Sequence, residues 1–316
     1  MQTISILHPL TALILSPLLP GIINRTKAFF AGRKGQPLLQ MYYDLARLFQ
    51  KTPVYSQTTS WIFRAGPLAG LASAVTALLV LPIGGGAAMF NFTGDLIFLI
   101  YLLGVMRFFT VLAALDTGSA FEGMGASREV QFSVLAEPAL LLSLLAMGEI
   151  GEIALPVGIQ ETLPHLSLSG IYTSLSFSAW MHSGTVLLLA ASALLIVLLT
   201  ENSRIPVDDP TTHLELTMIH EVMVLDHSGP DLAMILYGAA IKLWIFSALL
   251  AGVLIPVRSG NFLLDGAATL GGIFLLSIVI GVIESSMARL RLLRIPQLLS
   301  GAGVLAILAI VLVLKG

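Results

Sequence analysis

The sequence predicts an all-α polytopic membrane protein with about eight transmembrane helices, and two observations support that prediction. The 316 residues are 56% hydrophobic and only 11% charged, whereas about a quarter of the residues of a soluble domain are charged. Apolar segments of about twenty residues, the length that crosses the hydrocarbon core, recur along the whole chain. The net charge of −2 is carried by the loops and gives no sign of nucleic-acid binding.

We expect eight spans in a single membrane domain. The first apolar segment follows Met1 without a basic region or a small-residue cleavage motif. It is therefore expected to be retained rather than removed as a signal peptide. The expected spans cover residues 4–23, 66–84, 95–115, 129–149, 183–200, 232–256, 264–287 and 296–314.

The basic residues predict the orientation of these spans, because Lys and Arg in short loops stay on the cytoplasmic side. Twelve of the 16 Lys and Arg fall in loops on one side, against two on the other. We therefore expect both termini outside and the polar loop at 201–231 on the cytoplasmic face of the inner membrane. The twelve are Arg25, Lys27, Arg33, Lys34, Arg47, Lys51, Arg64, Arg128, Arg204, Arg289, Arg291 and Arg294.

Residues 37–51 of the first loop have the pattern of an amphipathic helix lying in the membrane interface. Pro37 suits a first helical turn. Apolar and polar side chains then recur on opposite helix faces at spacings of three and four residues. The apolar face would carry Leu38, Tyr42, Leu45 and Phe49, and the polar face Gln40, Asp44, Arg47 and Lys51. The segment is interpreted as a membrane-surface anchor, with the wall of a lipid-like substrate cavity or a docking surface for a partner as alternatives.

The polar stretch from Thr200 to Leu232 concentrates acidic residues in an otherwise apolar chain. Carboxylates at the end of a membrane bundle cost desolvation unless water, a partner or a proton uses them. Seven of the 18 acidic residues lie here, namely Glu201, Asp208, Asp209, Glu215, Glu221, Asp226 and Asp231. The same stretch contains His213, His220 and His227, which we interpret as pH-sensitive loop histidines rather than a metal site, because no H-E-x-x-H motif is present.

Five ionisable residues fall inside the expected spans, where each costs a few kcal/mol and needs a partner, water or a function. A proline directly after Glu137 would free a backbone carbonyl and make room for water beside that carboxylate. Glu137 could then take up and release protons near neutral pH. The set is interpreted as a proton or ion path, with mutually neutralising structural pairs as the alternative, and it comprises Arg107, Glu129, Glu137, Lys242 and Glu284. For Glu284 a pair with Arg289 or Arg291 is expected.

Four motifs, in order, resemble those of one known family. They are G-R-K-G-Q-P-L-L-Q-M-Y-Y-D-L-A-R-L-F (32–49), A-L-D-T-G-S-A-F-E-G-M-G-A-S-R-E-V (114–130) with L-A-E-P (135–138), E-N-S-R-I-P-V-D-D-P-T-T-H-L-E-L (201–216) and E-S-S-M-A-R-L-R (284–291). The chain resembles the respiratory complex I subunit 1 family. It is more similar to the formate hydrogenlyase subunit 4 branch, found in membrane-bound group 4 [NiFe] hydrogenases.

The resemblance implies a subunit that joins a soluble redox arm to antiporter-like membrane subunits. An acidic funnel would include Glu129, Glu137, Asp208, Glu215 and Glu284, while Arg33, Asp44 and Arg47 would lie beneath docked hydrophilic large and small subunits. Val207, Thr211 and His213 replace Phe, Glu and Glu of the respiratory branch, which puts a quinone-coupled role in doubt. With no cysteine in the chain, the [NiFe] centre and the iron-sulfur clusters would belong to partners.

The leading hypothesis is a non-catalytic coupling subunit of a group 4 [NiFe] hydrogenase-like complex that moves protons or sodium. The alternatives are a quinone-site subunit of an NADH- or ferredoxin-linked respiratory complex, a stand-alone secondary transporter and a purely structural scaffold. The predicted ion path is Arg107, Glu129, Glu137, Glu201, Asp208, Glu215, Glu221, Lys242 and Glu284. The predicted docking residues are Arg33, Asp44, Arg47, Arg204 and Asp226.

Overall fold

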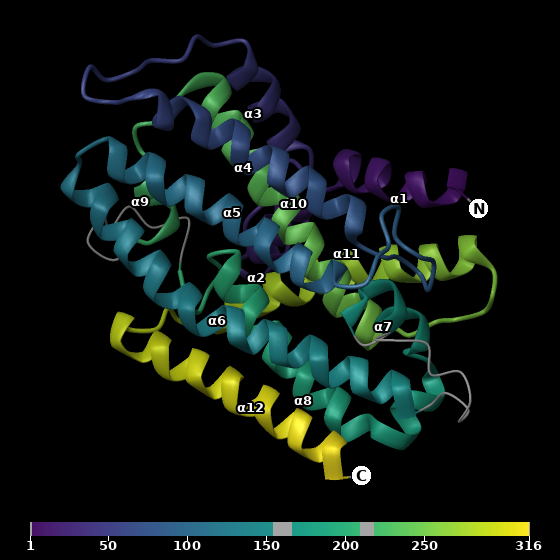
Figure 1. Ribbon diagram of the computed structural model, residues 1–316. Coiled ribbons are helices and arrows are strands. Elements are labelled where there is room, and N and C mark those ends of the chain that lie inside the picture. Colours follow the sequence, from purple (N-terminus) through teal and green to yellow (C-terminus); the bar gives the residue numbers. More distant parts are fainter. Residues whose placement is uncertain (1, 154–165, 209–217, 316) are drawn as a thin grey trace.

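The computed structural model describes residues 2–153, 166–208 and 218–315, and these contain helices and loops but no β-strand. Figure 1 shows long helices side by side in a bundle, with α9 toward one end and both termini away from it. The helices are α1 (Gln2–Leu15), α2 (Leu18–Phe30), α3 (Gln40–Phe49), α4 (Trp61–Val80), α5 (Asp95–Asp116), α6 (Ala120–Ile153), α7 (Leu168–Ser174), α8 (Phe177–Glu201), α9 (His220–Met223), α10 (Gly229–Leu254), α11 (Phe262–Ser286) and α12 (Ile295–Lys315), with a 3₁₀ turn η2 (Leu292–Arg294).

Within the described residues, seven helices are long and apolar enough to cross a membrane, namely α4, α5, α6, α8, α10, α11 and α12. The bent pair α1 and α2 forms an eighth candidate. The predicted fold class, an all-α membrane protein with about eight spans, is therefore confirmed. The largest difference in length concerns α6, which extends over Ala120–Ile153 where a span at 129–149 was expected, and which continues through Pro138.

The first expected span is broken rather than continuous, because α1 and α2 are bent by 44°. Pro17 lies at the break and has no backbone N–H to bond the Leu13 carbonyl. That carbonyl instead accepts a hydrogen bond from the Tyr237 hydroxyl of α10 at 2.8 Å. The Ile14 carbonyl accepts one from the Tyr42 hydroxyl of α3. Tyrosines from two other helices therefore stabilise the break.

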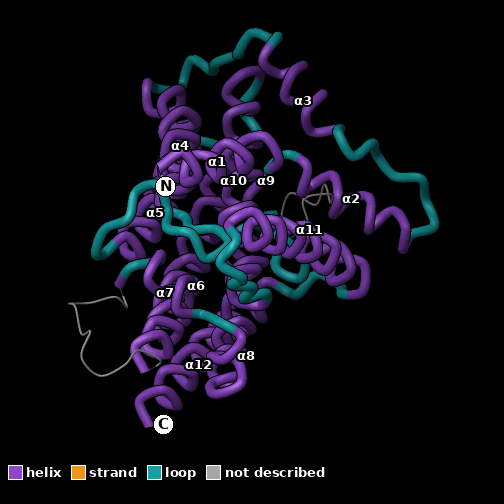
Figure 2. The backbone as a smooth tube through the Cα atoms, turned by 90° about the vertical axis from the view of Figure 1, so that its right-hand side faces the viewer, coloured by secondary structure: helices purple, strands orange, loops and turns teal. Residues whose placement is uncertain are grey.

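The helix predicted at 37–51 is present as α3, but it begins at Gln40 and ends at Phe49. Pro37 lies in the loop before it rather than in its first turn. α3 packs against α10 and α2, and Figure 2 shows it beside α2 at the edge of the bundle. The preceding loop lies tightly on α2, because a Cβ added at Gly21 would lie 2.1 Å from the Leu38 carbonyl oxygen.

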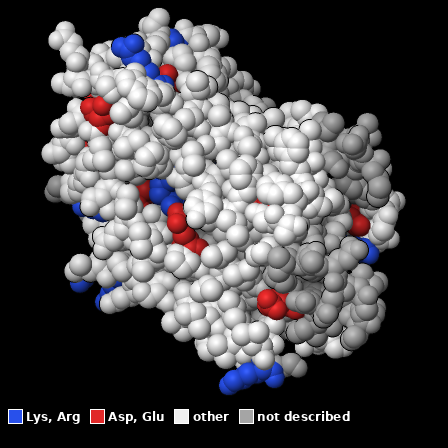
Figure 3. Space-filling view, viewed as in Figure 1, with Lys and Arg blue, Asp and Glu red and all other residues white. Residues whose placement is uncertain are grey.

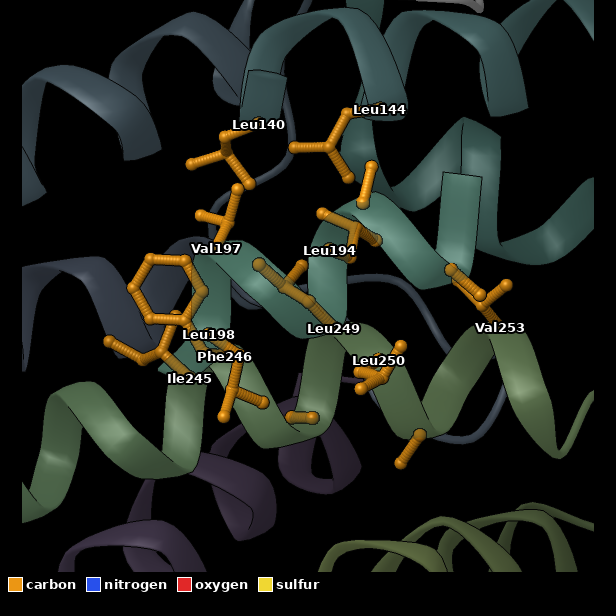
Figure 4. Packing of buried hydrophobic residues seen from close by; sticks show 14 of the residues in the cluster. Leu140, Leu144, Leu194, Val197, Leu198, Ile245, Phe246, Leu249, Leu250 and Val253 are labelled. Carbon is orange, nitrogen blue, oxygen red and sulfur yellow. The ribbon is translucent and has the colours of Figure 1, made fainter. Parts of the chain in front are cut away.

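The core of the bundle centres on α10, whose most apolar window is 72% buried, the largest share among the candidate spans. α10 packs against α4, α8 and α11. Figure 4 shows its apolar side chains with those of α6 and α8, including Leu140, Leu144, Leu194, Val197, Leu198, Ile245, Phe246, Leu249, Leu250 and Val253. This packing fixes the relative positions of three helices that also carry charged residues.

Candidate functional site: a buried charged cluster

Arg107 of α5 lies at the centre of a group of charged side chains inside the bundle. Its guanidinium bonds both carboxylate oxygens of Glu201 on α8, at 2.6 and 2.7 Å. It also pairs with Glu137 of α6 and lies 3.7 Å from the Glu129 carboxylate. Lys242 of α10 contacts Glu201 at 2.7 Å. We call these five residues, contributed by four helices, the charged cluster.

The charged cluster contains one more carboxylate than cation, because three glutamates face one arginine and one lysine. A buried carboxylate without its own counter-ion is costly unless a proton or a cation compensates it. The arrangement can therefore hold one additional positive charge, and a mobile proton or sodium ion meets that requirement chemically. Burial is uneven, since 41% of the Glu137 side chain is exposed against 5% for Glu201.

Glu137 is the member of the charged cluster nearest the surface of the bundle. Arg107 pairs with it, so the Glu137 carboxylate has a cation beside it as well as an exposed side. Gly104 of α5 faces it, since a Cβ added there would lie 3.9 Å from a Glu137 oxygen. Figure 3 shows basic and acidic atoms side by side near the middle of this face, over the region where α5 and α6 run side by side, and the other charged atoms in this view lie toward its edges.

Asp208 and Arg289 connect three segments at the end of the bundle where α9 lies. The Asp208 carboxylate contacts Arg289 at 2.9 Å and accepts hydrogen bonds from the backbone N–H groups of Ile219 and His220 at 3.0 and 3.2 Å. These contacts tie the turn after α8 to α9 and to the segment after α11. Arg128 of α6 donates to the Met218 carbonyl at 3.0 Å and fixes the same region to α6.

Glu284 of α11 forms a second ion-pair group, and its partners differ from those expected. Its fully buried carboxylate contacts Lys27 of α2 at 2.8 Å and Arg204 at 3.5 Å, not Arg289 or Arg291. The expected pair was based on proximity in sequence. The packing instead brings α2 against α11, so that a lysine 257 positions away in the numbering (284 minus 27) reaches the carboxylate.

A cavity of about 440 Å³ lies between α2, α3, α5, α10 and the segments around α8 and α9. The charged cluster borders it through four of its five members, and α3 forms another part of its wall. Its polar and charged lining residues include Asn24, Gln40, Asp44, Arg107, Thr110, Glu129, Glu201, Arg204, Asp208, His220, Glu221 and Lys242. The structure thus brings many of the predicted ion-path residues to one internal space.

Five predicted site residues lie outside that cavity, and one is not described. Glu137 and Glu284 are absent from its wall. Arg33 and Arg47 are exposed on the outer side of the first loop. The exposed Asp226 donates its backbone N–H to Glu122 at 3.1 Å, whereas Asp44 lines the cavity and accepts from Gln40 at 2.9 Å. Glu215, with Asp209 and His213, lies outside the described residues.

The two described loop histidines occupy different environments. His220 lines the cavity, and burial, reinforced by the nearby Lys242, lowers its pKa to about 4 despite the carboxylates of Asp208 and Glu201. His227 stacks on Phe63, with ring centroids 3.9 Å apart, and burial lowers its pKa as well. These two histidines are seven residues apart but do not lie on one helix, because α9 covers only His220–Met223.

Some important residues were missed by sequence reasoning. Lys27 was counted only as a loop cation, and no local pattern indicates its pairing with Glu284. Gly104 could have been noticed as a small residue one turn before Arg107, which leaves space on that helix face. Within the described ranges, no group of three or more His, Asp or Glu side chains could hold a metal ion.

Comparisons with known proteins find one matching family and two similar bacterial proteins. A profile of the NADH dehydrogenase family matches residues 2–315. Formate hydrogenlyase subunit 4 of Escherichia coli (strain K12) is 31% identical over 304 residues, covering 93% of this chain and 94% of that protein. Hydrogenase-4 component C of the same organism is 31% identical over 289 residues, covering 90% and 86%.

A solved structure has the same fold. A chain of the membrane-bound sulfane sulfur reductase, an archaeal respiratory membrane complex, superposes with a TM-score of 0.79 over 98% of both chains. Its sequence is 20% identical, so this similarity establishes the shared architecture. Together with the candidate spans, the relatives identify a multi-pass protein of the inner membrane.

Proposed function

The chain belongs to the NADH dehydrogenase family, and we propose that it anchors and couples a group 4 [NiFe] hydrogenase-like complex in the membrane. The E. coli relatives are named as a subunit of formate hydrogenlyase and a component of hydrogenase-4. The chain covers nearly all of the first and most of the second. In this role the chain itself performs no redox chemistry. It links the soluble redox arm to the movement of protons or sodium ions.

The observation that carries this proposal is the charged cluster. Its surplus carboxylate borders an internal cavity on one side, and through Glu137 it approaches the surface of the bundle on the other. A charge change in the docked arm shifts the proton affinity of the loop carboxylates, and the shift is passed between closely spaced titratable groups. The ion leaves past Glu137 toward antiporter-like membrane subunits.

The amino-acid composition and the expected orientation indicate which partner subunits carry the cofactors and where they dock. A chain without cysteine offers no thiolate ligands for a [NiFe] centre or an iron-sulfur cluster. Hydrophilic large and small subunits therefore carry these cofactors, and they dock on the cytoplasmic end over the segments that contain Asp44, Arg204 and Asp226. Lipids surround the spans.

The cavity beneath α3 favours a second candidate, the quinone-site membrane subunit of a respiratory oxidoreductase. A space of about 440 Å³ is within the usual range for a small-molecule site. Its wall combines apolar side chains such as Met41, Leu45 and Met106 with charged groups near Glu201 and Lys242, which suits a molecule with an apolar tail and a polar head. Quinone dependence of the purified complex separates the two candidates.

Purification of the complex through a tag on this chain, in mild detergent, tests the choice between them. Nickel in about a one-to-one ratio with this chain is the expected result and supports the hydrogenase-type complex. Iron without nickel, together with bound quinone, supports the second candidate and contradicts the first.

The coupling role is tested separately with Glu137→Gln. We expect hydrogen turnover to become uncoupled from ion movement, because the charged cluster loses its surplus negative charge. Glu149→Gln is the matched control, since it makes the same change on the same helix away from Arg107. If Glu137→Gln left turnover and ion movement both as in the wild type, the proposed path through Glu137 would be wrong.

A further inference from the structure

The segment from Arg25 to Lys51 carries five exposed cations that form no ion pair with the described carboxylates. We call Arg25, Arg33, Lys34, Arg47 and Lys51, all exposed, the basic surface. None of the five forms an ion pair with a carboxylate in the parts of the chain that the structure describes. Lys27 is different, because it is paired with Glu284. The segment therefore presents several uncompensated positive charges.

Aromatic side chains are exposed between these cations. Phe29 and Phe30, at the end of α2, are 79% and 57% exposed and precede Arg33 and Lys34. On α3, Tyr43 is 59% exposed and lies one turn before Arg47. Aromatic rings beside basic residues, where a membrane helix ends, are typical of the lipid headgroup region.

The segment is held in place by its own contacts. Arg25 donates a hydrogen bond to the Lys34 carbonyl at 2.8 Å. Gly35 has a φ of +66°, and a Cβ added there would lie 2.5 Å from the Ala28 side chain, so the chain folds back onto α2. Tyr42 ties α3 to the Ile14 carbonyl. A surface fixed in this way loses little conformational freedom when it binds a ligand.

We propose that the basic surface binds the headgroups of anionic phospholipids at the cytoplasmic leaflet. The phosphate of the lipid meets the cations, while its glycerol and acyl chains lie against Phe29, Phe30 and Tyr43. Charge complementarity favours an anionic lipid over a zwitterionic one, because each basic residue near such a surface contributes about a fivefold gain in binding. The inner face of α3, with Asp44, remains turned to the cavity.

Native mass spectrometry of the intact, delipidated complex tests this proposal. The complex is titrated with dioleoyl phosphatidylglycerol and, separately, with dioleoyl phosphatidylcholine. We expect the wild type to bind phosphatidylglycerol more tightly, and the preference to fall at least tenfold when Arg33, Lys34, Arg47 and Lys51 are all replaced by Gln. The matched control replaces the exposed Arg291 and Arg294 by Gln, and it should keep the preference.

A second measurement applies even if the fourfold variant does not assemble. Raising the salt concentration should weaken binding of phosphatidylglycerol to the wild type but leave phosphatidylcholine binding unchanged, because exposed charges are screened by salt. Equal binding of both lipids by the wild type would overturn the proposal. So would a fourfold variant that keeps the lipid preference but loses the water-soluble subunits, because the basic surface would then be a protein-docking site.

Discussion

Arg107 and Lys242 are both buried cations, but they neutralise different numbers of carboxylates. Arg107 lies against three glutamates, whereas Lys242 pairs with Glu201. Removing one partner of a buried ion pair costs about 3–5 kcal/mol, because the remaining charge is left uncompensated. We therefore expect Arg107→Met to lower the midpoint of thermal unfolding of the purified complex clearly more than Lys242→Met does.

A double variant shows whether this loss comes from uncompensated charge. Combining Arg107→Met with Glu201→Gln removes one of the stranded carboxylates and should recover part of the lost stability, measured as the same unfolding midpoint. Equal losses in the two single variants, or no recovery in the double variant, would show that packing rather than charge determines the effect.

His220 predicts how stability depends on pH. Burial lowers its pKa in the folded protein to about 4, from an ordinary value of 6.5. Between these two values the unfolded chain binds the extra proton, so stability falls as the pH decreases from 6.5 towards 4. His220→Gln should reduce the loss between pH 7.5 and pH 5.5 by on the order of 1 kcal/mol, measured by unfolding of the detergent-purified complex at both pH values.

His182 provides the control for that measurement, because it is exposed at the start of α8. His182→Gln should lose as much stability on acidification as the wild type. An unchanged pH dependence in His220→Gln would mean that other groups, such as the buried His227, dominate the response.

At the scale of elements, the hydrogen bond from Tyr42 to the Ile14 carbonyl connects α3 to the break between α1 and α2. Loss of the hydroxyl leaves that carbonyl without this partner and costs about 1 kcal/mol. We expect Tyr42→Phe to increase hydrogen–deuterium exchange of the α3 amides, Gln40–Phe49. Tyr43→Phe is the matched control, since its side chain points to the outside, and it should leave exchange unchanged.

Tyr237→Phe separates the two halves of this arrangement. Its hydroxyl donates a hydrogen bond from α10 to the Leu13 carbonyl of α1, so exchange should rise in α1 rather than in α3. Faster exchange of α3 in both variants would show that the break behaves as one unit.

The elements were more predictable than their contacts. Apolar length alone located the spans, and the periodicity of Leu38, Tyr42, Leu45 and Phe49 located α3. The break in the first span has a local signal in the sequence, the prolines Pro17 and Pro20. The pairing of Lys27 with Glu284 had none, because it depends on how α2 packs against α11.

At the scale of the whole molecule, the charged cluster exists because four helices converge. Arg107, Glu137, Glu201 and Lys242 lie on α5, α6, α8 and α10. Sequence reasoning identified Arg107, Glu137 and Lys242 as unusual within apolar segments, and Glu201 as part of the acidic loop. It could not show that they meet, since buried charges can be compensated by any neighbouring helix. The packing of α10 against α8 brings Lys242 to Glu201. The charged residues therefore lie close enough together to form the proposed ion path.

The orientation of the molecule, with both termini outside, is the remaining prediction at this scale. It depends on the twelve basic residues in loops of one side against two in those of the other, and the absence of cysteine allows a direct measurement. Single cysteines are introduced at the exposed positions Gln57 and Lys315, and intact cells are treated with a membrane-impermeant maleimide.

We expect the cysteine at position 315 to be labelled in intact cells and the cysteine at position 57 only after permeabilisation, because the first loop faces the cytoplasm. The cysteine-free wild type controls for background labelling. The reverse pattern would place the cavity-lining loops and the basic surface on the outside. Soluble redox subunits in the cytoplasm could not then dock over the charged cluster, so this labelling result bears on the proposed function as well as on the topology.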